Sequence, residues 1–287
     1  MYGPLIIAYL FFGGAAAGAL FVVCAWSIFF RRTPQPERLA DAFATLRRRI
    51  LGTGVVLLAF AMMCLLWDLG NPERALLVFL HPHPTAITFG AYSLAACAFL
   101  AATLFAERFF GKPALRGRAR LALELLCCAA SLAVMSYTGV FLLQGAIPLW
   151  QHWSIVGLFT FSSLSAGVSI VMLIDWFTQG NRLLLRSVKP LQRLHLLCLA
   201  CETAFLALFV WAACANPNAQ NAIALLAAPD MLATAIIGAC GMGIALPASM
   251  EGYALARTEC RTIPVADMLC LTGCLTLRYC VITCGVY

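Results

Sequence analysis

The sequence predicts an all-helical integral membrane protein with eight membrane-spanning helices. Hydrophobic residues make up 63% of the 287 residues and charged residues only 11%, and the mean hydropathy is +0.91. These values exclude an ordinary soluble domain. Runs of about 20 apolar residues, the length that crosses roughly 30 Å of hydrocarbon, lie near 4–30, 50–68, 85–106, 121–143, 153–177, 194–214, 230–250 and 265–285.

The first apolar run is expected to remain as a membrane helix. No basic residue precedes it, its apolar stretch is longer than that of a cleavable signal peptide, and Arg31 and Arg32 follow it as a stop-transfer flank.

The basic residues predict the orientation in the membrane. All but Arg74 and Arg278 of the 19 Lys and Arg residues fall in or beside the connections after the first, third, fifth and seventh runs. Because cytoplasmic loops retain positive charge, both termini are expected outside. The net charge of +7 then favours contact with anionic lipid at the inner leaflet, and nothing in the sequence indicates nucleic acid as a partner.

A weak internal repeat predicts two four-helix bundles, over 1–150 and 151–287. FGGAAAG at 12–18 is similar to FSSLSAG at 161–167, four runs later, and so in the same direction through the membrane. Small residues also recur in any packed membrane helix, which is the simpler interpretation of these segments.

The segment WDLGNPER, 67–74, joins the second and third runs. It places an acid, a glycine turn, a proline and an arginine at the bilayer surface, which predicts a shaped, partly buried site. The alternative is a plain helix stop, with Gly70 as the C-cap and Pro72 as the breaker.

Several segments together resemble the NrfD and PsrC family, the membrane subunits of polysulfide reductase-like enzymes. The matching segments are GGAAAG, WDLGNPER, TAITFGAY, YTGVFLLQGAIPLW, SSLSAG and LRYCVITCG.

The resemblance implies a haem-free anchor in the cytoplasmic membrane of a bacterium or archaeon. Such an anchor exchanges electrons between the quinone pool, with menaquinone as the expected quinone, and a four-cluster, ferredoxin-like iron–sulfur subunit on the outer face. That partner connects it to a molybdopterin or other catalytic subunit, which carries the terminal substrate chemistry. Neither the terminal substrate nor the direction of electron flow follows from this chain.

The residues themselves indicate that no metal cofactor is bound. Transmembrane haem needs facing axial ligands, and none of His81, His83, His152 and His195 forms a pair at bilayer depth. All but Cys260 of the 14 cysteines lie in predicted helices, without the wrapping loop that an iron–sulfur cluster needs. They are interpreted as small core residues. Any electron carrier is therefore expected to be a quinone that enters from the lipid.

The predicted quinone site lies at the outer end of the first bundle. A quinone headgroup needs partners for two carbonyl oxygens within an apolar cleft, and the resemblance places these partners on the first and fourth helices. The predicted catalytic residues are Tyr9, Asp68 and Tyr137, and the predicted binding residues add Trp67, Arg74, Gln144 and His152. Membrane-interface anchoring is the simpler interpretation of either tyrosine alone.

Four ionisable residues inside or near the membrane are candidates for a proton relay: Glu124, Asp175, Glu202 and Arg278. Glu124 and Asp175 lie near the cytoplasmic surface, where solvation alone can explain them. Glu202 and Arg278 lie deeper and are able to pair if their helices touch. A structural ion pair and a redox-coupled role remain equal alternatives for these two.

Two other functional classes compete with the quinone anchor. A secondary transporter also has repeats and buried charges, but its helices are usually broken by Gly or Pro at the substrate site, and here Pro247 is the main interior proline. A purely structural scaffold is disfavoured by Glu202 and Arg278.

Overall fold

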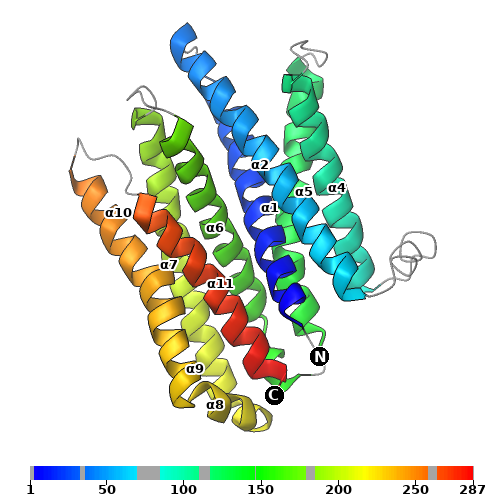
Figure 1. Cartoon of the computed structure of the whole chain (residues 1–287), viewed down its shortest axis with the longest axis vertical. Helices are drawn as coiled ribbons and strands as arrows, with labels where there is room; N and C mark the ends of the chain where they lie inside the picture. Colours follow the sequence, from blue (N-terminus) through cyan, green and yellow to red (C-terminus); the bar gives the residue numbers. More distant parts are fainter. Residues whose placement is uncertain are drawn as a thin grey trace.

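The protein is a bundle of long helices, seen in a computed structural model that describes residues 3–32, 36–69, 85–109, 117–145, 147–178, 185–257 and 264–286 (Figure 1). The described part contains no strand. Its elements are α1 (Pro4–Phe30), α2 (Glu37–Leu69), α4 (Ala86–Phe109), α5 (Gly117–Leu143), η1 (Pro148–Trp150), α6 (Ser154–Thr178), α7 (Leu185–Ala215), η3 (Pro217–Ala219), α8 (Gln220–Leu226), α9 (Pro229–Ala233), η4 (Thr234–Ala245), α10 (Leu246–Ala256) and α11 (Pro264–Val286).

Eight segments of the described chain are long and apolar enough to cross a membrane, as predicted. The helices α1 and α6 are central, and 72% of the apolar window of each is buried. The apolar windows of α2, α4, α7 and the seventh span are at most 33% buried, with large hydrophobic side chains such as Val56, Phe99 and Ile237 at the surface. An exposed apolar surface of this extent fits a hydrocarbon surrounding, so this is a multi-pass membrane protein.

The two central helices approach each other through the small residues of the GGAAAG and SSLSAG segments. A Cβ atom on Gly18 would overlap the backbone of Ser163, and one on Gly167 would overlap the backbone of Gly18. Small residues allow this backbone contact, which supplies the van der Waals packing that holds membrane helices together.

Some helices are longer than the apolar runs that predicted them, because polar residues extend the helix beyond the apolar part. The second helix begins at Glu37 and the sixth at Leu185, well before their apolar stretches, because hydropathy finds only the part of a helix that suits lipid. The seventh span is also less regular than expected, since Thr234–Ala245 is π-helical. In this stretch Gly243 lies against Gly273 of α11, so a Cβ atom on Gly273 would overlap the backbone of Gly243.

The two ends of the bundle differ. Both termini lie at one end, here called the terminal end, and the opposite end is called the basic end (Figure 1). At the basic end α1 is followed by Arg31 and Arg32. The helix α1 packs on α2 and α5, and α6 packs correspondingly on α7 and α11. We retain the division into two four-helix bundles as a proposal, which these matching contacts support.

Candidate functional site

The terminal end holds two buried phenols that come from different helices. Tyr9 of α1 and Tyr137 of α5 are 7% and 6% exposed, and their side chains lie close enough to interact. Gly90 of α4 makes room for this pair, because a Cβ atom at that position would overlap the Tyr137 ring. The glycine in the TAITFGAY segment therefore has a packing role beside the two tyrosines.

Asp68 lies at the same end but is exposed, which corrects the expectation of a partly buried carboxylate. The α2 helix carries it to the start of α1, where its Oδ1 atom is 3.2 Å from the place that a Cβ atom on Gly3 would occupy. Trp67 beside it is 73% exposed. Both side chains are exposed, so water or lipid reaches them. Arg74, with the rest of the predicted turn from Gly70 on, lies outside the described residues.

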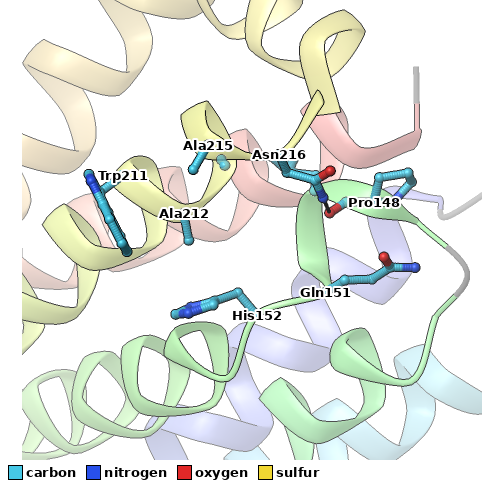
Figure 2. Close-up of a pocket in the computed structure, with 9 residues that line it drawn as sticks. Pro148, Gln151, His152, Trp211, Ala212, Ala215 and Asn216 are labelled. Carbon is cyan, nitrogen blue, oxygen red and sulfur yellow. Dashed lines mark hydrogen bonds between the residues drawn. The ribbon is translucent and has the colours of Figure 1, made fainter. Parts of the chain in front are cut away.

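His152 belongs to a separate pocket of about 260 Å³ between η1 and the end of α7 (Figure 2). Trp211 and Asn216 form its other side, and the Asn216 amide donates a hydrogen bond to the Pro148 carbonyl at 3.1 Å. Tyr9 and Tyr137 do not line this pocket. Gln144 is exposed at the end of α5 and does not line it either.

The tautomer of His152 follows from its neighbours. The backbone N–H of Ser154 donates to His152 Nδ1 at 3.2 Å, and the Ser154 hydroxyl lies 2.7 Å from the same atom. A nitrogen that accepts hydrogen bonds carries no proton, so a neutral ring is protonated at Nε2. The structure thus separates the residues predicted for one quinone site into a phenol pair and a histidine pocket.

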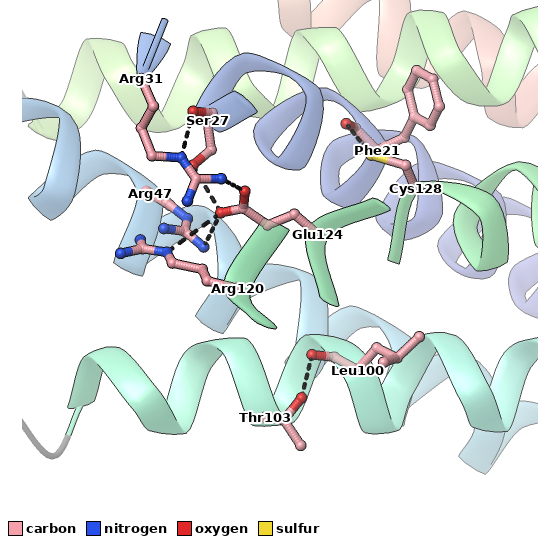
Figure 3. Close-up of polar contacts among 9 residues, drawn as sticks. All are labelled: Phe21, Ser27, Arg31, Arg47, Leu100, Thr103, Arg120, Glu124 and Cys128. Carbon is pink, nitrogen blue, oxygen red and sulfur yellow. Dashed lines mark hydrogen bonds and ion pairs between the residues drawn. The ribbon is translucent and has the colours of Figure 1, made fainter. Parts of the chain in front are cut away.

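At the basic end, Glu124 is fully buried and is surrounded by arginines (Figure 3). Arg31 contacts one carboxylate oxygen, and Arg47 Nη2 and Arg120 Nε lie 2.8 and 3.6 Å from the other. The Ser27 hydroxyl also donates to it at 2.9 Å. Simple solvation of Glu124, the interpretation that its position near the surface suggested, is wrong because arginines of α2, α5 and the end of α1 contact it.

Asp175 of α6 is 6% exposed, so it too is buried rather than solvated. Near it at the basic end, Arg49 of α2 donates to the Thr178 hydroxyl at 3.0 Å.

Glu202 and Arg278 are both buried but form no ion pair within 4.0 Å. The Arg278 guanidinium instead donates hydrogen bonds to two serines of α6. Nη1 donates to the Ser162 hydroxyl at 3.1 Å and Nη2 to the Ser163 hydroxyl at 2.8 Å. Glu202 of α7 also interacts with Ser162. Ser162 of α6 therefore contacts both side chains.

One polar cluster was not predicted. Three helices, α7, α10 and α11, bring together His195, Glu251 and Asp267, and each of these residues is at most 3% exposed. Glu251 and Asp267 lie near the ends of their apolar runs, and no sequence pattern connects them with His195. Only the packing of three helices reveals the group.

The cysteines of the described residues are free thiols, and most are buried. Cys97 lies 3.5 Å from the Ser131 hydroxyl, and Cys128 donates to the Phe21 carbonyl at 3.8 Å. These contacts agree with the interpretation of cysteines as small core residues.

A search among curated proteins found no match. A family model described as "Polysulphide reductase, NrfD" matches residues 1–287, the whole chain. Members of this family are quinone-interacting membrane subunits of oxidoreductases, and they associate with iron–sulfur and molybdopterin subunits. The eight apolar helices and the match over the full length agree, and this chain belongs to the NrfD family.

Proposed function

We propose that this protein is the quinone-reactive anchor of a respiratory complex and that the quinone headgroup binds beside Tyr9 and Tyr137. The observation that carries this proposal is the convergence of two phenols from α1 and α5 at the terminal end. Phenol hydroxyls both donate and accept hydrogen bonds. They are therefore suited to the carbonyl oxygens of a quinone and to the hydroxyls of a quinol.

In this proposal, oxidation of one quinol releases two electrons and two protons. The electrons leave one at a time to an iron–sulfur cluster of a partner docked at the terminal end, and the reverse reaction reduces quinone. Asp68, exposed at the end of α2, passes protons between the headgroup and water. Tyr9 and Tyr137 orient the headgroup, and neither becomes oxidised. Menaquinone and a molybdopterin catalytic subunit complete the proposed assembly.

The orientation belongs to the same proposal. The basic loops favour an inner location for the basic end, and both termini lie at the opposite end, so the phenols would face the outer compartment. The phenol pair lies toward this end, close to where a docked iron–sulfur subunit would sit.

The decisive variant for the proposed function is Asp68→Asn, which keeps the shape of the side chain and removes its acid. In the assembled complex, quinol-dependent turnover should fall at least about tenfold, equivalent to roughly 1.4 kcal/mol of barrier. Reduction of the terminal substrate by an artificial dye bypasses the quinone and should be unchanged. Wild-type quinol turnover in the variant would show that Asp68 only ends its helix.

A further inference from the structure

The helices α7, α10 and α11 contain a buried group of ligand-type side chains that the proposed quinone chemistry does not use. One atom each from His195, Glu251 and Asp267 lies within 4.8 Å of the other two. His195 is 0% exposed, Glu251 3% and Asp267 1%. Because three separate helices supply the residues, their convergence is a property of the fold and not of a local sequence pattern.

The hydrogen bonds around His195 orient its ring toward the carboxylates. Nδ1 lies 2.5 Å from Glu251 Oε1, and Nε2 lies 3.1 and 3.3 Å from the hydroxyls of Ser165 and Ser169. A histidine that binds a metal commonly donates its other ring N–H to an oxygen acceptor, which fixes the tautomer. The two serines provide such an acceptor, and Nδ1 then presents its lone pair to the acids.

The two acids are incompletely satisfied. Glu251 Oε2 and Asp267 Oδ1 are buried and have no hydrogen-bond partner in the described part of the chain. Within the same part, neither carboxylate forms an ion pair with Lys or Arg, and His195 is the one basic partner of Glu251. Burial of a carboxylate costs several kcal/mol unless it is paired, hydrogen-bonded or bound to a metal.

One proton is not sufficient to satisfy this group. A proton between Nδ1 and Oε1 would resolve their short contact, but it would leave Oε2 of Glu251 and Oδ1 of Asp267 without a donor. A divalent cation can be coordinated at once by the imidazole nitrogen and by one oxygen of each carboxylate. Its two positive charges balance the two negative charges of the acids.

We propose that His195, Glu251 and Asp267 bind one divalent transition-metal ion that ties α7, α10 and α11 together. Imidazole with carboxylates suits ions such as Zn²⁺, Mn²⁺ or Fe²⁺. The site does not depend on the proposed quinone chemistry. Its occupation stabilises the packing of these three helices, because an ion that binds the folded state shifts the unfolding equilibrium.

The test uses the purified full-length protein in detergent after removal of metals with a chelator. Mn²⁺ is the first probe, since it prefers oxygen and imidazole ligands and avoids the many free thiols. The loss of the free Mn²⁺ EPR signal should show one saturable site in the wild type. Asp267→Asn and His195→Gln should each weaken binding at least about tenfold. The matched control is Asp230→Asn, which removes an exposed acid at the opposite end of the seventh span and should bind as the wild type does.

Co²⁺ provides a second measurement that needs no variant. Bound at this site, it should give visible absorption without the thiolate charge-transfer band that cysteine ligands produce. A thiolate band, no saturable binding of Mn²⁺ to the wild type, or unchanged affinity in both folded variants would each overturn the proposed site.

Discussion

The two ends of the molecule differ in whether their buried polar groups are charged. At the basic end, Arg31, Arg47 and Arg120 converge on the buried Glu124 and join α1, α2 and α5. At the terminal end, Tyr9 and Tyr137 are uncharged, and the nearby Asp68 is exposed. Charges that bind one another fix the helices that carry them, whereas Tyr9 and Tyr137 are uncharged groups that can exchange hydrogen-bond partners. On the proposed function, the basic end holds the helices together and the terminal end carries the chemistry.

The largest expected effect is that of Glu124→Gln at the basic end. This change leaves three arginines around a neutral amide, and removal of one partner of a buried ion pair costs roughly 3–5 kcal/mol. Denaturant unfolding in detergent should show a loss of about that size. Arg48→Gln is the matched control, because Arg48 is an exposed neighbour of Arg47, and its loss should cost less than about 1 kcal/mol. Equal stability of Glu124→Gln and Arg48→Gln would remove the contrast between the two ends.

The next effect is that of Gly90→Ala at the terminal end. The added methyl group overlaps the Tyr137 ring, and overpacking of this kind costs about 1–3 kcal/mol. The ring must move, so quinol-dependent turnover of the complex should fall together with the unfolding free energy. Gly117→Ala is the control, since a Cβ atom there has no neighbour within 4 Å. Wild-type turnover in Gly90→Ala would show that the position of the Tyr137 ring does not matter.

The smallest expected effect on stability is that of Tyr137→Phe. It removes one hydroxyl from the pair formed with Tyr9, and a single polar interaction of this kind is worth about 0.5–1.5 kcal/mol. Quinol turnover should nevertheless fall at least about tenfold, a barrier change of roughly 1.4 kcal/mol. Steady-state assays with quinol and with dye separate the two effects. A fall in both assays would indicate that assembly, and not headgroup binding, has failed.

The eight-helix architecture could be predicted from sequence because hydropathy acts locally. The eight spans follow from apolar runs, and the α1–α6 contact involves the GGAAAG and SSLSAG segments that the repeat singled out. The exposure of Asp68 and the π-helical stretch in the seventh span were not predictable, since both depend on packing between segments distant in sequence.

The candidate site was predicted only in part. Tyr9 and Tyr137 are together, as expected, whereas His152 faces Trp211 in a pocket of its own. Residues in connections at the terminal end share one end of the bundle, but which neighbour each side chain faces depends on helix rotation. Glu202 and Arg278 illustrate the same point, since Ser162 of α6 contacts both of these residues, whose depths alone suggested a pair.

The central claim is that the quinone headgroup binds at the phenol pair. The most direct measurement is photolabelling of the purified wild-type protein with a photoreactive quinone, followed by mapping of the labelled peptides. The account predicts labels on α1 around Tyr9 and on α5 around Tyr137, displaced by excess unlabelled menaquinone and reduced in Tyr137→Phe. Displaceable labels confined to the pocket of His152 and Trp211 would contradict it.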